Sequence, residues 1–235
     1  MIRIGLLIGA VCAAVSLATG CESNPPDIVE VDLTVYALTD RERNTTYEVL
    51  SLFVSAGDLD GVEDLDRLYL IHDDAELFWA THGDAWLQVV ADGDTWIGEP
   101  RLAMPDRGPF PDGTYRVVLV DAAGESTERE LVMAPGRTSP PPAAVVLSGS
   151  RAQIAGNGEH ELWLLGADGL AGVATLEGGG EIDLAELTAG SRLGSRYDLY
   201  VVTRTADHRS QAMIGPFGWS VAPAPGSRNA QGSRN

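Results

Sequence analysis

Lysine is absent from this sequence. All 16 basic residues are arginine, against 34 aspartate and glutamate residues, and the formal net charge is −18. A chain without a basic face is a poor partner for a phosphate backbone, so we expect no nucleic-acid binding. The missing lysine itself has no functional explanation in the sequence. A hydrophobic content of 44% with 21% charged residues is typical of a folded globular chain.

Cysteine is scarce, and so are long hydrophobic runs. The only apolar run of note covers residues 4–17 and follows Arg3. It is shorter than the roughly 20 residues that span a bilayer, and it is typical of a signal peptide, predicted here as residues 1–20. The two cysteines are Cys12, inside that segment, and Cys21, directly after it. The mature chain would therefore keep one cysteine and form no internal disulfide.

Small residues lead into Cys21, in the order Leu17-Ala-Thr-Gly-Cys21. This segment resembles a bacterial lipobox, although Ala18 stands where leucine is usual. The resemblance implies lipidation of Cys21 and an exported protein that is anchored to the membrane of the bacterial cell envelope by several acyl chains. The alternative is an ordinary secretory signal that contains a cysteine by chance. Residues 21–27 would form a short tether.

Polar and apolar residues alternate along much of the chain after residue 27, as in half-buried β-strands. Glycine and aspartate turns separate the candidate strands, and no helical period of useful length is present. The number of strands predicts an antiparallel β-sandwich over residues 28–134. The expected strands are residues 29–35, 47–54, 67–72, 76–80, 86–90, 115–120 and 126–133, with 101–104 as a short edge strand.

A proline-rich segment, residues 135–142, follows and ends in three consecutive prolines. Such a segment favours an extended form and predicts a semi-rigid linker. Residues 143–222 predict a second, smaller β domain, in which Asp183 caps a single helical turn. Residues 223–235 are expected to be a disordered tail. The strands of the second domain are expected at residues 143–147, 161–165, 173–176, 197–203 and 211–214. The fold class is therefore all-β.

Two groups of motifs in the first domain point to a known family. An acidic turn, Asp58-Leu-Asp60-Gly61, precedes the third strand, and Asp112-Gly-Thr-Tyr115 precedes a late one that turns back at Asp121-Ala-Ala-Gly124. Together they resemble bacterial immunoglobulin-like and fibronectin type III-like domains of exported proteins. The whole chain also resembles uncharacterised spirochaete-type lipoproteins. The resemblance implies a tyrosine corner at Tyr115, with Val117 where antibody domains have a disulfide cysteine.

An acidic segment is the first candidate site. It gathers eight carboxylates between residues 58 and 76 with Arg67 as the only base. Crowded carboxylates are ligands for a hard cation, so Asp58, Asp60, Glu63 and Asp64 form a candidate calcium site. Their spacing does not fit an EF-hand. The other interpretation is a solvated turn that keeps the protein soluble and protects a sheet edge.

Three tryptophans, Trp79, Trp86 and Trp96, form the second candidate site. They could make a platform that stacks on a sugar or contacts a protein; otherwise they fill the core. On a strand, Phe78 and Trp79 point to opposite faces, so we expect one of them to be exposed. Trp163 and Trp219 belong, in our interpretation, to the core of the second domain.

The sequence offers little for catalysis. Its four histidines lack metal-ligand spacing, and neither a nucleophile elbow nor a phosphate-binding glycine loop is present. We therefore predict a protein that is not an enzyme and has no cofactor apart from calcium. The favoured function is a non-catalytic binding or structural module at the cell envelope, with an envelope protein or a glycan as partner. The alternatives are a calcium-assisted carbohydrate-binding module and an envelope hydrolase.

Overall fold

The computed structural model describes residues 24–57, 61–91, 93–134, 139–167, 169–188, 195–205 and 211–221. Almost all the regular structure in these ranges is β-strand, apart from the short helices η1 (Val62–Asp64) and α2 (Leu184–Leu187). The prediction of an all-β fold is therefore confirmed. None of the helices in these ranges has the length and apolar composition needed to cross a bilayer.

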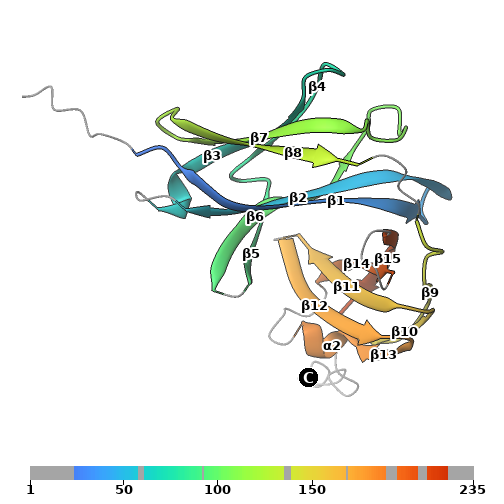
Figure 1. Cartoon of the computed structure of the whole chain (residues 1–235). Helices are drawn as coiled ribbons and strands as arrows, with labels where there is room; N and C mark the ends of the chain where they lie inside the picture. The colour runs from blue at the N-terminus through green and yellow to red at the C-terminus, as the bar shows by residue number, and fades with distance from the viewer. Residues whose placement is uncertain are drawn as a thin grey trace, which may run out of the picture.

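The first half of the chain folds as a sandwich of two four-stranded antiparallel sheets, which we call the first sandwich (Figure 1). One sheet has the order β1-β2-β6-β5, and it faces the sheet β4-β3-β7-β8. Lettered in chain order, these are the orders A-B-E-D and C′-C-F-G. The strands are β1 (Asp27–Asp40), β2 (Thr45–Gly57), β3 (Leu65–His72), β4 (Leu77–His82), β5 (Leu87–Ala91), β6 (Asp94–Ala103), β7 (Gly113–Asp121) and β8 (Ser126–Met133).

The second half repeats this plan with one strand fewer, and we call it the second sandwich. Its sheet β13-β10-β9 faces the strands β12-β11-β14-β15. In the same lettering the orders are E-B-A and C′-C-F-G, so strand D, which is β5 in the first sandwich, has no counterpart among the described residues of the second. The strands are β9 (Ala144–Ser148), β10 (Arg151–Ala155), β11 (Glu159–Gly166), β12 (Gly169–Glu177), β13 (Gly180–Asp183), β14 (Arg196–Arg204) and β15 (Gln211–Ser220).

The two sandwiches share one eight-stranded sheet. Strand β15 pairs in parallel with β1, through four residue pairs from Ala37↔Ala212 to Asp40↔Gly215. The resulting order is β12-β11-β14-β15-β1-β2-β6-β5. The sheet curls so far that its two end strands, β5 and β12, come into contact (Figure 1). The halves are thus joined by a sheet as well as by the connection around residues 135–142.

Three buried clusters hold this arrangement together. One fills the first sandwich, with Leu68 and Leu119 fully buried, and another fills the second, with Leu162 and Leu164. The third joins the halves across the shared sheet. Each leucine that is fully buried on folding contributes about 1.5–3 kcal/mol. The third cluster, which we call the joining cluster, contains Tyr36, Leu38, Val49, Tyr200, Val202 and Met213.

Several details of the first sandwich agree with the sequence. The hydroxyl of Tyr115 donates to the carbonyl of Pro111 at 2.8 Å, so the tyrosine corner is confirmed, and Val117 is buried in the core at the position of the absent cysteine. Phe78 is 70% exposed while Trp79 packs against the core, as strand alternation predicts. In the second half, Asp183 caps α2 by accepting from the backbone N–H of Ala185, as expected.

Other expectations are corrected. Residues 101–104 do not form an edge strand. Residues 101–103 are the end of the longer β6, which lies between β2 and β5, and Met104 follows it. Pro100 is tolerated there because the β2–β6 register shifts between Leu50 and Leu52, opposite the proline, and the hydrogen-bond ladder is interrupted. Strands β10 and β13 were not expected. The predicted signal peptide, Cys21, the first part of the linker and the tail lie outside the described residues.

Candidate functional site

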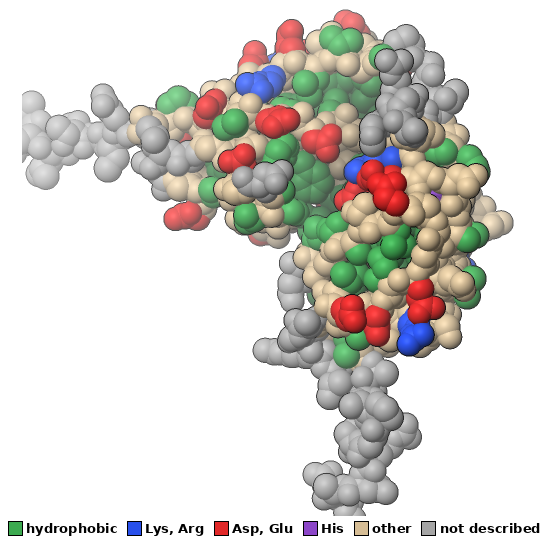
Figure 2. Space-filling view, turned by 60° about the horizontal axis from the view of Figure 1, so that its bottom comes forward, with side chains coloured by type: hydrophobic (Ala, Val, Ile, Leu, Met, Phe, Trp, Pro, Cys, Tyr) green, Lys and Arg blue, Asp and Glu red, His purple; other side chains and the backbone are tan. Residues whose placement is uncertain are grey.

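The concave face of the shared sheet forms a groove between the two sandwiches, and we treat this inter-sandwich groove as the candidate site. Figure 2 shows apolar side chains gathered where the two halves meet. The groove exists because β5 and β12 close the curled sheet from opposite ends. At this seam, an added Cβ on Gly169 would lie only 3.1 Å from the Leu87 side chain. The starts of β5 and β12 therefore fit closely together.

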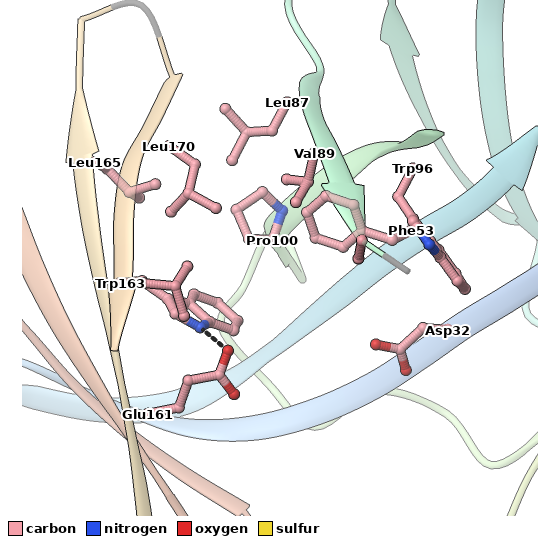
Figure 3. A pocket seen from close by; sticks show the side chains of 12 residues that line it. Asp32, Phe53, Leu87, Val89, Trp96, Pro100, Glu161, Trp163, Leu165 and Leu170 are labelled. Carbon is pink, nitrogen blue, oxygen red and sulfur yellow. Dashed lines mark hydrogen bonds between the residues drawn. The ribbon is translucent and has the colours of Figure 1, made fainter. Parts of the chain in front are cut away.

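One part of the groove is an apolar chamber of about 270 Å³. Strand alternation explains its lining, because residues that point away from the sandwich cores point into it. On β2, for example, Leu52 and Val54 belong to the first core and Phe53 points into the chamber (Figure 3). The full lining is Asp32, Phe53, Leu87, Val89, Ala91, Trp96, Pro100, Glu161, Trp163, Leu165, Leu170 and Val173.

A network of polar contacts fixes the wall formed by β11. The indole N–H of Trp163 donates to Glu161 at 2.7 Å (Figure 3), and the same carboxylate pairs with Arg204 at 2.7 Å. The ring of Trp163 meets the ring of Tyr36 edge-on, with centroids 5.8 Å apart. Burial raises the pKa of the Tyr36 hydroxyl, and the charge of Asp32 acts in the same direction. Trp163 is therefore held in one orientation from two sides.

Next to the apolar chamber lies a polar chamber of about 520 Å³. The two chambers share Leu87, Pro100 and Leu165 in their linings. The other residues of the polar chamber are Asp84, Ala85, Trp86, Glu99, Arg101, Gly166, Ala167 and Gly169. Apolar and charged surfaces therefore meet along one continuous groove.

The charged groups of the polar chamber are held in different ways. The guanidinium of Arg101 lies 4.6 Å from the ring centroid of Tyr200 and donates to its hydroxyl. Glu99 accepts from the backbone N–H of Arg101 at 3.2 Å. Burial raises the pKa of the Glu99 carboxyl above its ordinary value, against the smaller effects of that hydrogen bond and of the Arg101 charge. Glu99 is thus a carboxylate whose charge is poorly compensated.

A third cavity, of about 320 Å³, continues from Glu99 and Arg101 toward the end of β1. Its carboxylate Asp40 is buried, and Arg43 binds it through the side chain at 2.9 Å and through the backbone N–H at 3.0 Å. Burial alone would raise the pKa of Asp40, but the hydrogen bonds and the charge of Arg43 outweigh it and lower the pKa. Asp40 is therefore compensated by the chain itself, in contrast to Glu99.

The three predicted platform tryptophans do not share one surface. Trp79 packs in the first sandwich, where its indole N–H donates to the carbonyl of Ala103 at 3.0 Å and its ring lies 5.3 Å from that of Phe110. Trp96 lines the apolar chamber and Trp86 lines the polar chamber. The structure therefore brings two of the three to the groove, at different places along it.

The predicted metal ligands are placed only in part. Asp58 and Asp60 lie outside the described residues, and Glu63 and Asp64 lie on η1. Farther along the acidic segment, Asp73 pairs with Arg116 at 2.7 Å. Within the described ranges no group of three histidine, cysteine, aspartate or glutamate side chains could hold a metal ion. The calcium site stays a prediction.

The groove itself was missed at the sequence level. Trp163, which we expected in the second core, packs instead against the joining cluster and lines the apolar chamber, whereas Trp219 does pack in that core. One signal was available. Residues 49–54 form a nearly continuous apolar run, which indicates a strand buried on both faces and hence a layer beyond the first sandwich.

Comparisons with known proteins identify no relative for this chain. No family model matches it, and no curated protein matches it. Similar solved structures include dimeric latent PorU from Porphyromonas gingivalis (14% identity, TM-score 0.34, 86% of this chain) and the 47-kilodalton lipoprotein Tp47 of Treponema pallidum (12%, 0.33, 84%). The BSP domain of a biofilm associated protein is 13% identical, with a TM-score of 0.24 over 83% of this chain. The matches cover 21%, 52% and 30% of those three chains, respectively.

Proposed function

We propose that this protein is a non-catalytic binding module of the bacterial cell envelope, which holds an apolar ligand in the inter-sandwich groove. The observation that carries the proposal is the apolar chamber, where Phe53, Trp96 and Trp163 converge with aliphatic side chains from both sandwiches. A concave, largely apolar pocket with a few polar groups is the usual form of a small-ligand site. Its volume of about 270 Å³ suits a single alkyl chain or ring system rather than a folded partner.

The chemistry of the lining supports binding rather than catalysis. In the apolar chamber, within the described residues, the only ionisable side chains are Asp32 and Glu161. Glu161 is already engaged by Arg204 and Trp163. A general acid or base must be free to exchange a proton with its substrate, and a carboxylate held by two donors is badly placed for that task.

The envelope location rests on the sequence around Cys21. A lipobox-like segment, a single mature cysteine and a short tether support an acyl anchor, and the immunoglobulin strand order supports membership in the immunoglobulin-like domains of exported proteins. Labelling with radioactive palmitate tests the anchor. The wild type should incorporate label and sediment with membranes, and Cys21→Ala should do neither. A Cys21→Ala variant that still sediments with membranes would contradict the anchor.

Binding to the groove is tested with decyl maltoside, a neutral single-chain amphiphile, titrated below its micelle concentration by calorimetry. Trp163→Ala removes one wall of the apolar chamber and should weaken binding by about tenfold or more, the loss of roughly 1.4 kcal/mol or more. Trp219→Ala is the matched control, because Trp219 packs in the second core and donates to the carbonyl of Gly149. Its affinity should match the wild type. Equal loss in both variants would contradict a site in the groove.

A further inference from the structure

We propose that the ligand of the groove is a cationic amphiphile, with its alkyl chain in the apolar chamber and its positive head group beside Glu99 and Asp84. This inference rests on the proposed function, because it names the chemical class of the ligand held in the same groove. The apolar chamber and the polar chamber form one path, since Leu87, Pro100 and Leu165 line both. A linear molecule can therefore lie in both at once.

The polar chamber has an excess of negative charge where a head group would sit. Its ionisable side chains are Asp84, Glu99 and Arg101. The positive charge of Arg101 is directed to Tyr200, over whose ring it lies and to whose hydroxyl it donates. Among the described residues, neither Asp84 nor Glu99 forms a salt bridge. The chamber thus offers two carboxylates to an incoming cation.

Trp86 adds a second element of cation recognition. It packs partly buried against the core of the first sandwich and lines the polar chamber together with Asp84 and Leu87. The face of an indole ring attracts a cation through its quadrupole, and this attraction is strongest when the site is partly desolvated. Carboxylates and an indole ring next to the apolar chamber favour a quaternary ammonium or amine head group over a neutral or an anionic one.

The cavity beyond Glu99 does not supply the missing positive charge. Besides Glu99 and Arg101 of β6, its ionisable groups come from β1, β2 and β14 and from the turn between β1 and β2. Arg43 is the one cation there besides Arg101, and it is bound to Asp40. The remaining ionisable groups are Glu42, Asp198 and the hydroxyls of Tyr47 and Tyr200. A cationic ligand would therefore lower the electrostatic cost of Glu99, whose burial already raises the pKa of its carboxyl.

The test compares three decyl amphiphiles of equal chain length, each below its micelle concentration: decyltrimethylammonium, decyl maltoside and decyl sulfate. Titration calorimetry on the full mature chain at pH 7 and physiological salt should give the affinity order cationic, neutral, anionic. We expect about tenfold between the first and the last, equivalent to roughly 1.4 kcal/mol. Physiological salt is used because it screens the long-range attraction of a protein with net charge −18.

The Glu99→Gln variant tests whether the preference for a cationic head group comes from the polar chamber. Glutamine keeps the shape and the acceptor for the N–H of Arg101 and removes the charge, so the variant should lose most of the tenfold preference for the cationic over the anionic amphiphile. Glu130→Gln, on the exposed face of β8, changes the net charge equally and should keep the preference. Equal affinities for all three amphiphiles, or a preference that survives in Glu99→Gln, would overturn the inference. Failure of decyl maltoside to bind would instead overturn the proposed function.

Discussion

The two sandwiches share a strand order but present opposite sheets to each other. The first contributes its A-B-E-D sheet to the shared sheet, and the second contributes its C′-C-F-G sheet. In the part of the chain that the structure describes, only the first has a strand D, β5, and this strand meets β12 and supplies Leu87, Val89 and Ala91 to the apolar chamber. The groove is thus built by the element that the second sandwich lacks. The unmatched strand closes one side of the groove, whose other walls come from β1, β2, β6, β11 and β12.

Core truncation in each half tests whether the halves behave as one cooperative unit. Leu119→Ala in the first sandwich and Leu164→Ala in the second each empty a fully buried position and should cost about 2–5 kcal/mol of unfolding free energy. Because the joining cluster and the β1–β15 pairing couple the halves, each variant should show one unfolding transition, shifted as a whole. Urea denaturation followed by far-UV circular dichroism and by tryptophan fluorescence measures this. Two separate transitions would mean that the sandwiches are independent.

Two glycines, one in each sandwich, test the contact between β5 and β12. Gly169, the first residue of β12, and Gly93, between β5 and β6, both have positive φ, at 110° and 92°. Only at Gly169 would a Cβ meet a neighbour, the Leu87 side chain across the seam. Both alanine variants should suffer backbone strain, of about 1–3 kcal/mol. Gly169→Ala should lose more stability than Gly93→Ala and, unlike it, should weaken decyl maltoside binding. Equal losses of stability and of affinity in the two variants would show that β5 and β12 are not in contact in solution.

Tyr115→Phe measures what the tyrosine corner contributes to the first sandwich. The substitution keeps the buried ring, which lies 4.6 Å from the ring of His72, and removes the hydrogen bond to Pro111. The unfolding free energy should fall by about 1 kcal/mol, the usual net value of one such bond. Binding in the groove should not change, because Tyr115 lies in the core on the far side of the shared sheet. A change in affinity at unchanged stability would contradict this placement.

The sequence predicts the local features of the fold better than its assembly. Alternation of residue types is enough to place Phe78 outside and Trp79 inside, and the Asp112-Gly-Thr-Tyr115 motif predicts the tyrosine corner. The location of Trp163 could not be predicted in this way. Alternation separates the two faces of β11 but does not reveal which face meets the other sandwich, because that depends on the parallel pairing of β1 with β15. A pairing between residues 37 and 212 leaves no local signature in either segment.

Two carboxylates at the polar end of the groove should respond to pH in opposite ways. The pKa of Asp40 is lowered in the folded state, so its stabilising effect is present above its ordinary pKa of 3.8 and is lost as the pH falls through the lower, folded value. The pKa of Glu99 is raised, so it costs stability as the pH rises from its ordinary 4.5 through the higher, folded value. At pH 7, Asp40→Asn should therefore lower the melting temperature and Glu99→Gln should raise it slightly.

Both differences from the wild type should shrink as the pH is lowered. The difference of Glu99→Gln shrinks as the pH falls through the raised, folded pKa of Glu99 and is gone below the ordinary value of 4.5, whereas that of Asp40→Asn starts to shrink only below 3.8 and is gone only below the lower, folded pKa of Asp40. Melting curves of the three proteins between pH 3 and pH 7 measure this. A gain of stability combined with a loss of cation preference in Glu99→Gln would mark Glu99 as a residue retained for binding at the expense of stability. A lower melting temperature for Glu99→Gln at pH 7 would instead mean that a positive charge of the chain already compensates Glu99, and the two carboxylates would then be alike.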